Sequence, residues 1–343
     1  MMGLLHDMRD KFALLPIFLL VCLSACSGRM DAAKNSSMLS PTPQTTPLAK
    51  IALKPDAELE KQIADIARDA KGKVGVTSVL LETGDTAGLN ANQHYPMQSV
   101  YKLPISMAVT DQIDRGRHNL DEKITVMKTD FVRKGQRSPL RDENPNGGEF
   151  TIRELMRLAL VESDGTASDV LLRILGGPLE AQAYLTKIGI HDIKIVSYER
   201  EIGGTDWDIQ YKNWATPTAA VELLRILYER QKSEPTSNSQ PTNSEPNGQT
   251  HARLLLQFMA DSMPGARRLK GLLPPGTPIA HKTGTSGARN NIESATNDIG
   301  IITLPNGNHI VIAVLVSDSP ANEKTREGVI AKIAKAVWDR WAN

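Results

Sequence analysis

Residues 299–316 read Ile-Gly-Ile-Ile-Thr-Leu-Pro-Asn-Gly-Asn-His-Ile-Val-Ile-Ala-Val-Leu-Val, and this stretch decides the class of fold. Two apolar segments, 299–304 and 309–316, flank Pro305-Asn306-Gly307-Asn308, which is a turn sequence typical of a β-hairpin. After the hairpin, apolar residues recur at the spacing of one helix face: Ile330, Ile333, Ala334, Val337, Trp338 and Trp341. The C-terminal part therefore predicts antiparallel strands covered by a helix.

The N-terminal part of the domain adds another helix and another strand to this arrangement. Pro55-Asp56 opens a predicted helix with Leu59, Ile63, Ile66 and Ala67 on one face, and residues 74–82 predict a strand. The middle of the chain is mostly helical, with a capping box at Thr151 and Glu154 and a helix break at Gly176-Gly177-Pro178. We therefore expect an α/β (α+β) fold: an antiparallel sheet flanked by helices, an all-helical lobe, and a site in the cleft between them.

Residues 1–25 predict a secretory signal. Basic residues precede an uncharged stretch, 12–25, that is too short to span a bilayer and ends in Leu23-Ser24-Ala25-Cys26. The ending resembles the bacterial lipobox, which implies a lipid on Cys26, export, and anchoring on the periplasmic side of the outer membrane. The alternative is an ordinary cleaved signal in which Cys26 is incidental. The only other cysteine, Cys22, lies inside the signal, so we expect no disulfide in the mature domain.

Composition divides the rest of the chain. Residues 26–52 are rich in Ser, Thr, Pro and Asn and predict a disordered tether, and 231–250 predict a disordered surface insertion without a catalytic role. Residues 53–343 then form one two-lobed catalytic domain, which we expect to be monomeric. The 40 basic and 39 acidic residues nearly balance, which gives no electrostatic case for a nucleic-acid partner. A small molecule is the expected ligand.

Three short motifs occur in the order of a serine acyl-transfer site. Ser99 and Lys102 are three residues apart, so on a helix that begins near Ser99 the amine can help to remove the hydroxyl proton. Ser163-Asp164-Gly165 supplies a second hydroxyl, although Ser163 or Asp164 could simply cap the following helix. Lys282-Thr283-Gly284 follows a predicted strand, where the alternative is a solvated strand end. Together the motifs point to nucleophilic catalysis without histidine.

These motifs resemble the penicillin-recognising serine enzymes, and with Glu199 the resemblance is closest to class A β-lactamases. Further stretches, 95–102, 210–214, 270–274 and 280–287, are similar to the PER-type extended-spectrum branch, and the similarity spans residues 53–343. The resemblance implies hydrolysis of penicillins and cephalosporins, with antibiotic resistance as the outcome and with no metal or cofactor.

The resemblance also assigns roles to residues. It implies that Ser99 attacks the β-lactam amide, while Lys102, or Glu199 through a water, takes the proton. Ser163 passes a proton to the leaving nitrogen, and Glu199 directs water onto the acyl-enzyme. Backbone N–H groups of Ser99 and Thr285 form the oxyanion hole. The implied substrate-binding residues are Ser163, Lys282, Thr283, Gly284, Thr285, Gly165 and Arg137.

The chain departs from the family pattern at five positions. Gly165 and Gly203 stand where asparagines commonly bind substrate and the deacylating water, respectively. Arg200 replaces a proline that is frequent after the glutamate. Arg137 takes the place of an aromatic residue at the rim of the cleft, and Ile299 replaces a common carboxylate-binding arginine. Substrate preference is therefore not fixed by the resemblance.

Three other functions are alternatives to a β-lactamase. A DD-peptidase uses the same serine and lysines, but it lacks a positioned base such as Glu199. A penicillin-binding sensor would also be acylated, but sensors normally follow several membrane spans. A metallo-hydrolase is less favoured, because the seven histidines never fall in an HxxxH or cysteine-paired pattern.

Overall fold

A computed structural model describes residues 52–202, 206–232 and 248–342, all of which belong to one compact unit. The predicted signal, Cys26 and all of the predicted tether except residue 52 lie outside the described residues. So do most of the predicted insertion, 231–250, and Gly203. Among the described residues, no helix has the length and hydrophobicity needed to cross a bilayer.

The main sheet has six strands in the order β1-β3-β2-β13-β12-β9. Their bounds are β1 (Lys54–Pro55), β2 (Lys73–Leu80), β3 (Asp85–Leu89), β9 (Ile279–Thr285), β12 (Thr296–Thr303) and β13 (His309–Ser317). All neighbours pair antiparallel except β1, which runs parallel to β3. The predicted hairpin is confirmed as β12 and β13, paired from Thr296↔Val316 to Thr303↔His309. β12 begins at Thr296, before the expected residue 299, and its polar residues Asn297 and Asp298 are buried and paired with β9.

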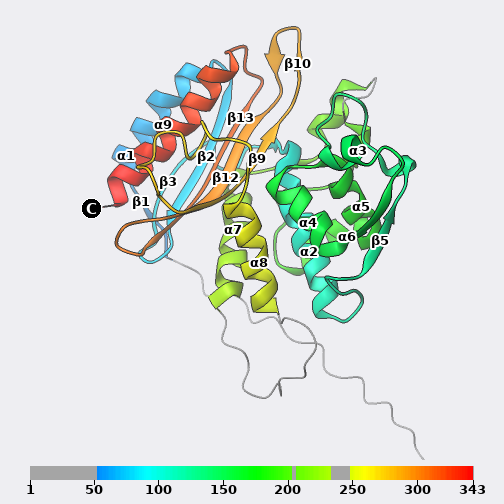
Figure 1. Cartoon of the computed structure of the whole chain (residues 1–343). Coiled ribbons are helices and arrows are strands. Elements are labelled where there is room, and N and C mark those ends of the chain that lie inside the picture. The colour runs from blue at the N-terminus through cyan, green and yellow to red at the C-terminus, as the bar shows by residue number, and fades with distance from the viewer. Residues whose placement is uncertain (1–51, 203–205, 233–247, 343) are drawn as a thin grey trace, which may run out of the picture. The chain divides into compact units, whose positions relative to one another are not determined.

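Helices cover both faces of this sheet (Figure 1). α1 (Ala57–Ala67) and α9 (Glu323–Trp341) pack together on one face, as the sequence predicted, and α7 (Pro217–Lys232) and α8 (Gly248–Ala260) lie against the other. Successive residues of β13 alternate between the two layers: Ile310, Ile312, Val314 and Val316 join the core with α1 and α9, and Val311, Ala313 and Leu315 join the opposite core. The sheet is thus buried on both faces.

The middle of the chain builds the helical lobe. Its helices are α2 (Lys102–Asp114), α3 (Pro139–Glu143), α4 (Ile152–Val161), α5 (Gly165–Leu175) and α6 (Pro178–Lys187). The expected capping box at Thr151 and Glu154 begins α4, and Gly176, with φ of 106°, ends α5. The remaining strands are short: β4 (Tyr95–Pro96), β5 (Lys123–Val126), β6 (Gly148–Thr151), β7 (Ile193–Lys194), β8 (Trp214–Ala215), β10 (Ala288–Arg289) and β11 (Ile292–Glu293).

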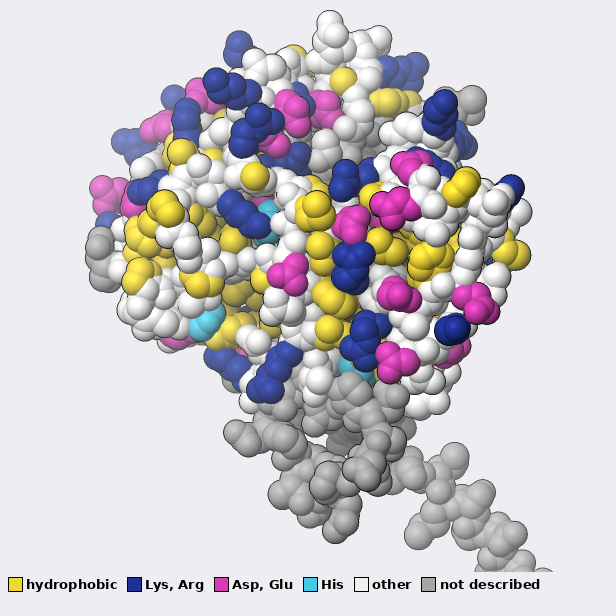
Figure 2. Space-filling model, in the orientation of Figure 1, with side chains coloured by type: hydrophobic (Ala, Val, Ile, Leu, Met, Phe, Trp, Pro, Cys, Tyr) yellow, Lys and Arg dark blue, Asp and Glu magenta, His cyan; other side chains and the backbone are white. Residues whose placement is uncertain are grey.

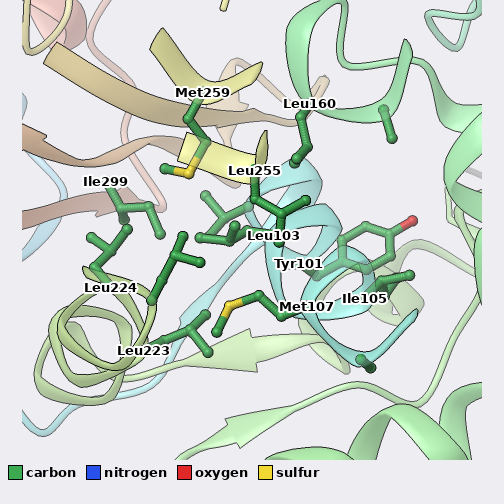
Figure 3. Close-up of a cluster of buried hydrophobic side chains, with 14 of the residues drawn as sticks. Tyr101, Leu103, Ile105, Met107, Leu160, Leu223, Leu224, Leu255, Met259 and Ile299 are labelled. Carbon is green, nitrogen blue, oxygen red and sulfur yellow. The ribbon is translucent and has the colours of Figure 1, made fainter. Parts of the chain in front are cut away.

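α2 is the central helix of the helical lobe and is buried on nearly every side. Figure 3 shows Leu103, Ile105 and Met107 from α2 among side chains of α4, α7 and α8. Burying a side chain of this size typically stabilises a fold by about 1.5–3 kcal/mol, so this cluster holds the start of α2 firmly in place. On the molecular face in Figure 2, basic and acidic side chains are interspersed, in keeping with the near-neutral charge.

Candidate active site

The predicted nucleophile lies at the entrance to α2. Ser99 is part of a one-turn 3-10 helix, η2 (Gln98–Tyr101), and is partly exposed, whereas Lys102, the first residue of α2, is buried. The expected single helix near Ser99 is therefore divided into a 3-10 turn and an α-helix. Gln98 has φ of 48°, a left-handed conformation that is uncommon for residues with a side chain and clusters at functional sites. That Lys102 reaches the Ser99 hydroxyl stays a prediction.

The Lys102 amine joins three segments that are far apart in the sequence. Its side chain is 1% exposed, and Nζ donates to the backbone oxygen of Ser163 at 2.7 Å. The same nitrogen lies 3.3 Å from Oε2 of Glu199. A buried amine needs such partners, because it has lost its water. The first and second motifs and the predicted base are thus in direct contact.

Lys282 approaches Ser163 from the sheet. It lies on β9, is fully buried, and donates from Nζ to the Ser163 hydroxyl at 2.9 Å. Burial, followed by the positive charge of Lys102, lowers the pKa of Lys282 well below its ordinary value. Ser163 has φ of 59°, again a left-handed conformation. The second and third motifs therefore meet as the resemblance implies.

Asp164 resolves the alternative interpretation of the second motif. Its carboxylate accepts the backbone N–H groups of Ala167, at 2.8 Å, and Leu140, at 2.7 Å, and it caps α5. Burial raises the pKa of Asp164 against these hydrogen bonds. The capping role thus belongs to Asp164, which leaves the Ser163 hydroxyl free to face Lys282.

The Glu199 carboxylate is turned toward the same centre. Oε2 accepts a hydrogen bond from the Tyr101 hydroxyl at 2.8 Å, besides its contact with Lys102, and the side chain is 15% exposed. Glu199 begins the 3-10 turn η4 (Glu199–Glu201). Sequence reasoning missed Tyr101, because its position inside the Ser-Val-Tyr-Lys motif gives no sign of where its hydroxyl points.

Two polar side chains hold the backbone around Glu199. Asp169, from α5, accepts the N–H of Glu199 at 2.7 Å and that of Arg200 at 3.0 Å. Gln136 donates to the Glu199 carbonyl at 2.6 Å. Burial raises the pKa of Asp169 to about 7, and the negative charge of Glu199 adds to this effect. Neither Asp169 nor Gln136 was predicted: Asp169 lies in α5, whose apolar residues explain the helix without it, and Gln136 lies in a polar loop that shows no periodic pattern.

The third motif closes the site on the sheet side. Gly284 is needed for packing, because a Cβ there would lie 2.2 Å from the Met97 backbone oxygen, just before η2. Thr285 is exposed, and its hydroxyl accepts from the buried Arg268 guanidinium at 2.7 Å. Arg268 also donates to the backbone oxygens of Gly284 and Asn297. Nothing in the sequence around Arg268 marked it for this role.

Ile299, noted in place of an arginine, does not reach the cleft. It pairs with Lys282 across β12 and β9, and its side chain is buried in the core beside Leu224 (Figure 3). The guanidinium that faces this edge of the site therefore comes from Arg268.

The site opens into a cleft of about 410 Å³. Its walls include Ser99, Ser163, Glu199, Thr283 and Thr285, together with Arg137. The other lining residues are Gln98, Gly135, Gln136, Ile202, Trp207, Gln210, Pro264, Ser286 and Gly287. Lys102 and Lys282 lie beneath the cleft floor, while Gly165 is buried behind Glu199. The substrate-binding role expected of Gly165 stays a prediction.

This arrangement suits acyl transfer. An accessible serine hydroxyl shares a cleft with a second hydroxyl that is bound to a buried amine, and a carboxylate contacts the other buried amine. Such groups can carry a proton from an attacking hydroxyl to a leaving group and can activate water. Within the described residues, no group of His, Cys, Asp or Glu side chains is placed to hold a metal ion.

Comparisons with known proteins agree with this chemistry. Residues 58–341 match the sequence model of the Beta-lactamase enzyme family. The chain is 36% identical to Beta-lactamase VEB-1 of Pseudomonas aeruginosa over 83% of its own length and 91% of that protein. It is 33% identical to Extended-spectrum beta-lactamase PER-1 of Pseudomonas aeruginosa, over 82% of the chain and 86% of that protein.

Solved structures give the same result for the fold. TLA-3 extended-spectrum beta-lactamase superimposes with a TM-score of 0.75 and 39% identity, over 83% of this chain and 99% of that one. A beta-lactamase from Chitinophaga pinensis gives a TM-score of 0.76 and 36% identity, over 83% and 100% of the two chains.

Proposed function

Because this chain belongs to the class A β-lactamase family and is a serine β-lactamase, we propose that it works through a Ser99 acyl-enzyme which water, activated by Glu199, then hydrolyses. The observation that carries this proposal is the position of Glu199. Its carboxylate borders the cleft that holds Ser99 and lies 3.3 Å from the Lys102 amine. A base at this point is what a slowly deacylating peptidase lacks.

In the acylation step, the Ser99 oxygen bonds to the β-lactam carbonyl carbon and the carbon–nitrogen bond then breaks. The hydroxyl proton passes to Lys102, or to Glu199 through a water. Ser163 donates a proton to the departing nitrogen and regains one through Lys282, to which its hydroxyl is bonded at 2.9 Å. The lowered pKa of Lys282, caused first by burial, makes its amine a readier proton carrier than an exposed lysine.

In the deacylation step, a water loses its proton to Glu199 as its oxygen attacks the ester carbon. The developing oxyanion is stabilised by the backbone N–H groups of Ser99 and Thr285. The proton then returns to the Ser99 oxygen as the ester bond breaks. Support comes from the cleft, which Ser99, Thr285 and Glu199 all border.

The proposed substrates are penicillins and cephalosporins. The names of the relatives PER-1 and TLA-3 describe those proteins as extended-spectrum enzymes. The cleft of about 410 Å³ suits a small ligand. Ser163, Lys282, Thr283 and Thr285 would hold the substrate carboxylate, with the Arg268 guanidinium behind Thr285 adding positive charge.

We further propose that the protein is exported, is anchored to the outer membrane by a lipid on Cys26, and acts as a monomer on the periplasmic side. The support is the sequence of residues 1–26. Labelling with a radioactive fatty acid tests this directly: the wild-type chain should carry label in the membrane fraction, and Cys26→Ala should not. Label on neither chain would leave an ordinary cleaved signal as the explanation. Gel filtration of the catalytic domain tests the monomer.

Turnover of a chromogenic cephalosporin, followed by intact mass spectrometry, tests the mechanism. Wild type should turn over without a lasting adduct, Ser99→Ala should form none, and Glu199→Ala should accumulate a covalent one. Glu201→Gln is the matched control, because that carboxylate lies in the same turn and bonds only locally to the Tyr198 N–H among the described residues. It should keep wild-type turnover. Stoichiometric trapping by wild type would instead support a peptidase or a sensor.

A further inference from the structure

The Tyr101 hydroxyl is a neutral hydrogen-bond donor to the proposed base. Tyr101 is fully buried, and its hydroxyl donates to Oε2 of Glu199 at 2.8 Å. In Figure 3 the ring lies beside Ile105, and its oxygen is directed away from Leu103 and Met107. The ring is thus packed in the apolar core, and its hydroxyl points out of the core toward Glu199.

A buried hydroxyl needs a specific partner. Without a hydrogen bond it destabilises a fold by about 1–3 kcal/mol, and a phenylalanine would fill the same apolar space. Burial, followed by the negative charges of Glu199 and Asp169, raises the pKa of Tyr101 well above its ordinary value. The hydroxyl therefore keeps its proton and acts as a donor to the carboxylate.

The hydroxyl and the Lys102 amine contact the same carboxylate oxygen. Both approach Oε2, and in the described part of the chain Oε1 of Glu199 has no hydrogen-bond partner. Asp169 and Gln136 fix the backbone of Glu199 at the other end of the residue. Glu199 is thus held at its backbone and at one carboxylate oxygen, and the second carboxylate oxygen is left to a ligand.

Gly165 lies beside Glu199 but offers it no donor. A Cβ at position 165 would lie 3.0 Å from Cγ of Glu199 and 3.1 Å from Cγ1 of Val132. Position 165 is therefore close to the carboxylate, but a glycine has no side chain with which to orient either the carboxylate or Lys102. Tyr101 is the side chain that orients the carboxylate from within the core.

We propose that Tyr101 is a positioning residue for deacylation: it holds Oε2 of Glu199 and thereby presents Oε1 to the hydrolytic water. This inference rests on the proposed role of Glu199 as the base. Acylation can draw on Lys102, whose contact with Ser163 does not involve Tyr101. Loss of the hydroxyl should consequently slow the two steps unequally.

Tyr101→Phe in the full chain tests the proposal. With a chromogenic cephalosporin, stopped-flow measurement gives the acylation rate, and quenched intact mass gives the decay of the acyl-enzyme. We expect acylation within about 3-fold of wild type and deacylation about 10- to 100-fold slower, the range for loss of a hydrogen bond to a charged group. Tyr184→Phe is the matched control, because it is also buried but its hydroxyl accepts from Arg230. Both of its rates should equal those of wild type.

A double-mutant cycle separates positioning from general structure. If Tyr101 acts only through Glu199, Tyr101→Phe should change deacylation little in a Glu199→Gln background. A global packing defect would slow both backgrounds equally, and that result would overturn the proposal. Deacylation by Tyr101→Phe within about 3-fold of wild type would overturn it as well.

Two measurements keep the test decisive. Thermal unfolding shows whether Tyr101→Phe folds. If it does not, 3-fluorotyrosine at position 101 keeps the ring and alters the hydroxyl as a donor, so deacylation should change while acylation does not. The Glu199→Gln variant distinguishes the proposed function from the inference about Tyr101. If Glu199→Gln does not trap an acyl-enzyme, the proposed function is rejected together with this inference. Trapping by Glu199→Gln without an effect of Tyr101→Phe rejects the inference alone.

Discussion

Lys102 and Lys282 donate to the two oxygens of one residue, Ser163. Lys102 binds the backbone oxygen at 2.7 Å and Lys282 binds the hydroxyl at 2.9 Å. Both amines are buried, and their mutual repulsion adds to burial in lowering the pKa of Lys282. Ser163 therefore joins the helical lobe to the sheet at the point where the proposed mechanism moves a proton.

Ser163→Ala tests this proton path. The substitution removes the hydroxyl but keeps the backbone oxygen that binds Lys102, so the lobes should stay together. We expect kcat/KM to fall by about 100- to 1,000-fold, because a positioned proton donor typically contributes 10²- to 10⁴-fold. The measurement is the acylation rate with a chromogenic cephalosporin.

The control for this prediction is Ser262→Ala. The Ser262 hydroxyl is also buried, but it has no hydrogen-bond partner within the described residues. Its removal should leave kcat/KM unchanged. An active Ser163→Ala enzyme would show that the leaving nitrogen takes its proton from elsewhere.

Gly284→Ala tests how closely β9 approaches the nucleophile turn. The added Cβ would lie 2.2 Å from the Met97 backbone oxygen, and backbone cannot move away as a flexible side chain can. We expect the free energy of unfolding to fall by about 2–3 kcal/mol and activity to fall with it, because η2 must shift. Urea unfolding measures the first effect and cephalosporin turnover the second.

Gly328→Ala is the contrasting substitution, because it should raise the free energy of unfolding instead of lowering it. Gly328 lies inside α9, and a Cβ there would meet no atom within 4 Å. Alanine should stabilise the helix by about 0.5–1 kcal/mol and leave turnover unchanged. Equal effects of the two substitutions would remove the steric explanation for Gly284.

Arg268→Lys tests whether the guanidinium supports substrate binding. Arg268 is 4% exposed and bridges Thr285, at 2.7 Å, and Glu327, at 3.2 Å. A lysine keeps the charge but cannot bind both partners in the planar geometry of a guanidinium. We expect KM to rise by about 10-fold with kcat nearly unchanged, as when a lost interaction had bound the substrate and the transition state equally.

The control is Arg267→Lys. Arg267 contacts the same carboxylate of Glu327 but is largely exposed, so its pair should contribute little. Steady-state kinetics should show wild-type KM. A rise in KM for Arg267→Lys equal to that for Arg268→Lys would assign the effect to Glu327 instead of to Thr285.

The main layers of the fold could be predicted because their signals are local. The hairpin of β12 and β13 follows from a turn flanked by apolar runs, and α1 and α9 follow from apolar stripes. The strand that carries Asp298 was cut short, because a buried carboxylate looks like a loop residue in the sequence. In the structure His281 lies 2.9 Å from it, and both are fully buried.

The motifs could be found because their spacing is short, but their partners could not. Tyr101 contacts Glu199 across 98 residues of sequence, and Asp169 contacts Glu199 across 30. Arg268 reaches Thr285 across 17 residues, and although the turn residues Pro274-Pro275-Gly276 between them are visible in the sequence, the contact is not. Contacts of this kind depend on how helices and sheet pack, and no periodicity in the chain encodes them.

The contact between Asp169 and the Glu199 segment makes stability depend on pH in a predictable direction. Asp169 is fully buried, and burial raises its pKa to about 7 from an ordinary value of 3.8. Between these values the native carboxyl keeps a proton that the unfolded chain has lost. The native state thus binds more protons, and the free energy of unfolding falls as pH rises through this window.

Asp169→Asn removes this dependence, because an amide does not titrate. The stability of wild type relative to the variant should therefore decline as pH rises from about 4 to about 7, by up to about 1.4 kcal/mol per pH unit. Urea unfolding at half-unit steps measures it. Glu154→Gln is the control: the Thr151 backbone N–H lowers the pKa of Glu154, so its contribution is lost only as pH falls below the ordinary value of 4.5. Its difference from wild type should stay flat above about pH 5. A flat difference for Asp169→Asn as well would mean that this carboxyl is ionised throughout, with the two backbone N–H groups of Glu199 and Arg200 outweighing its burial.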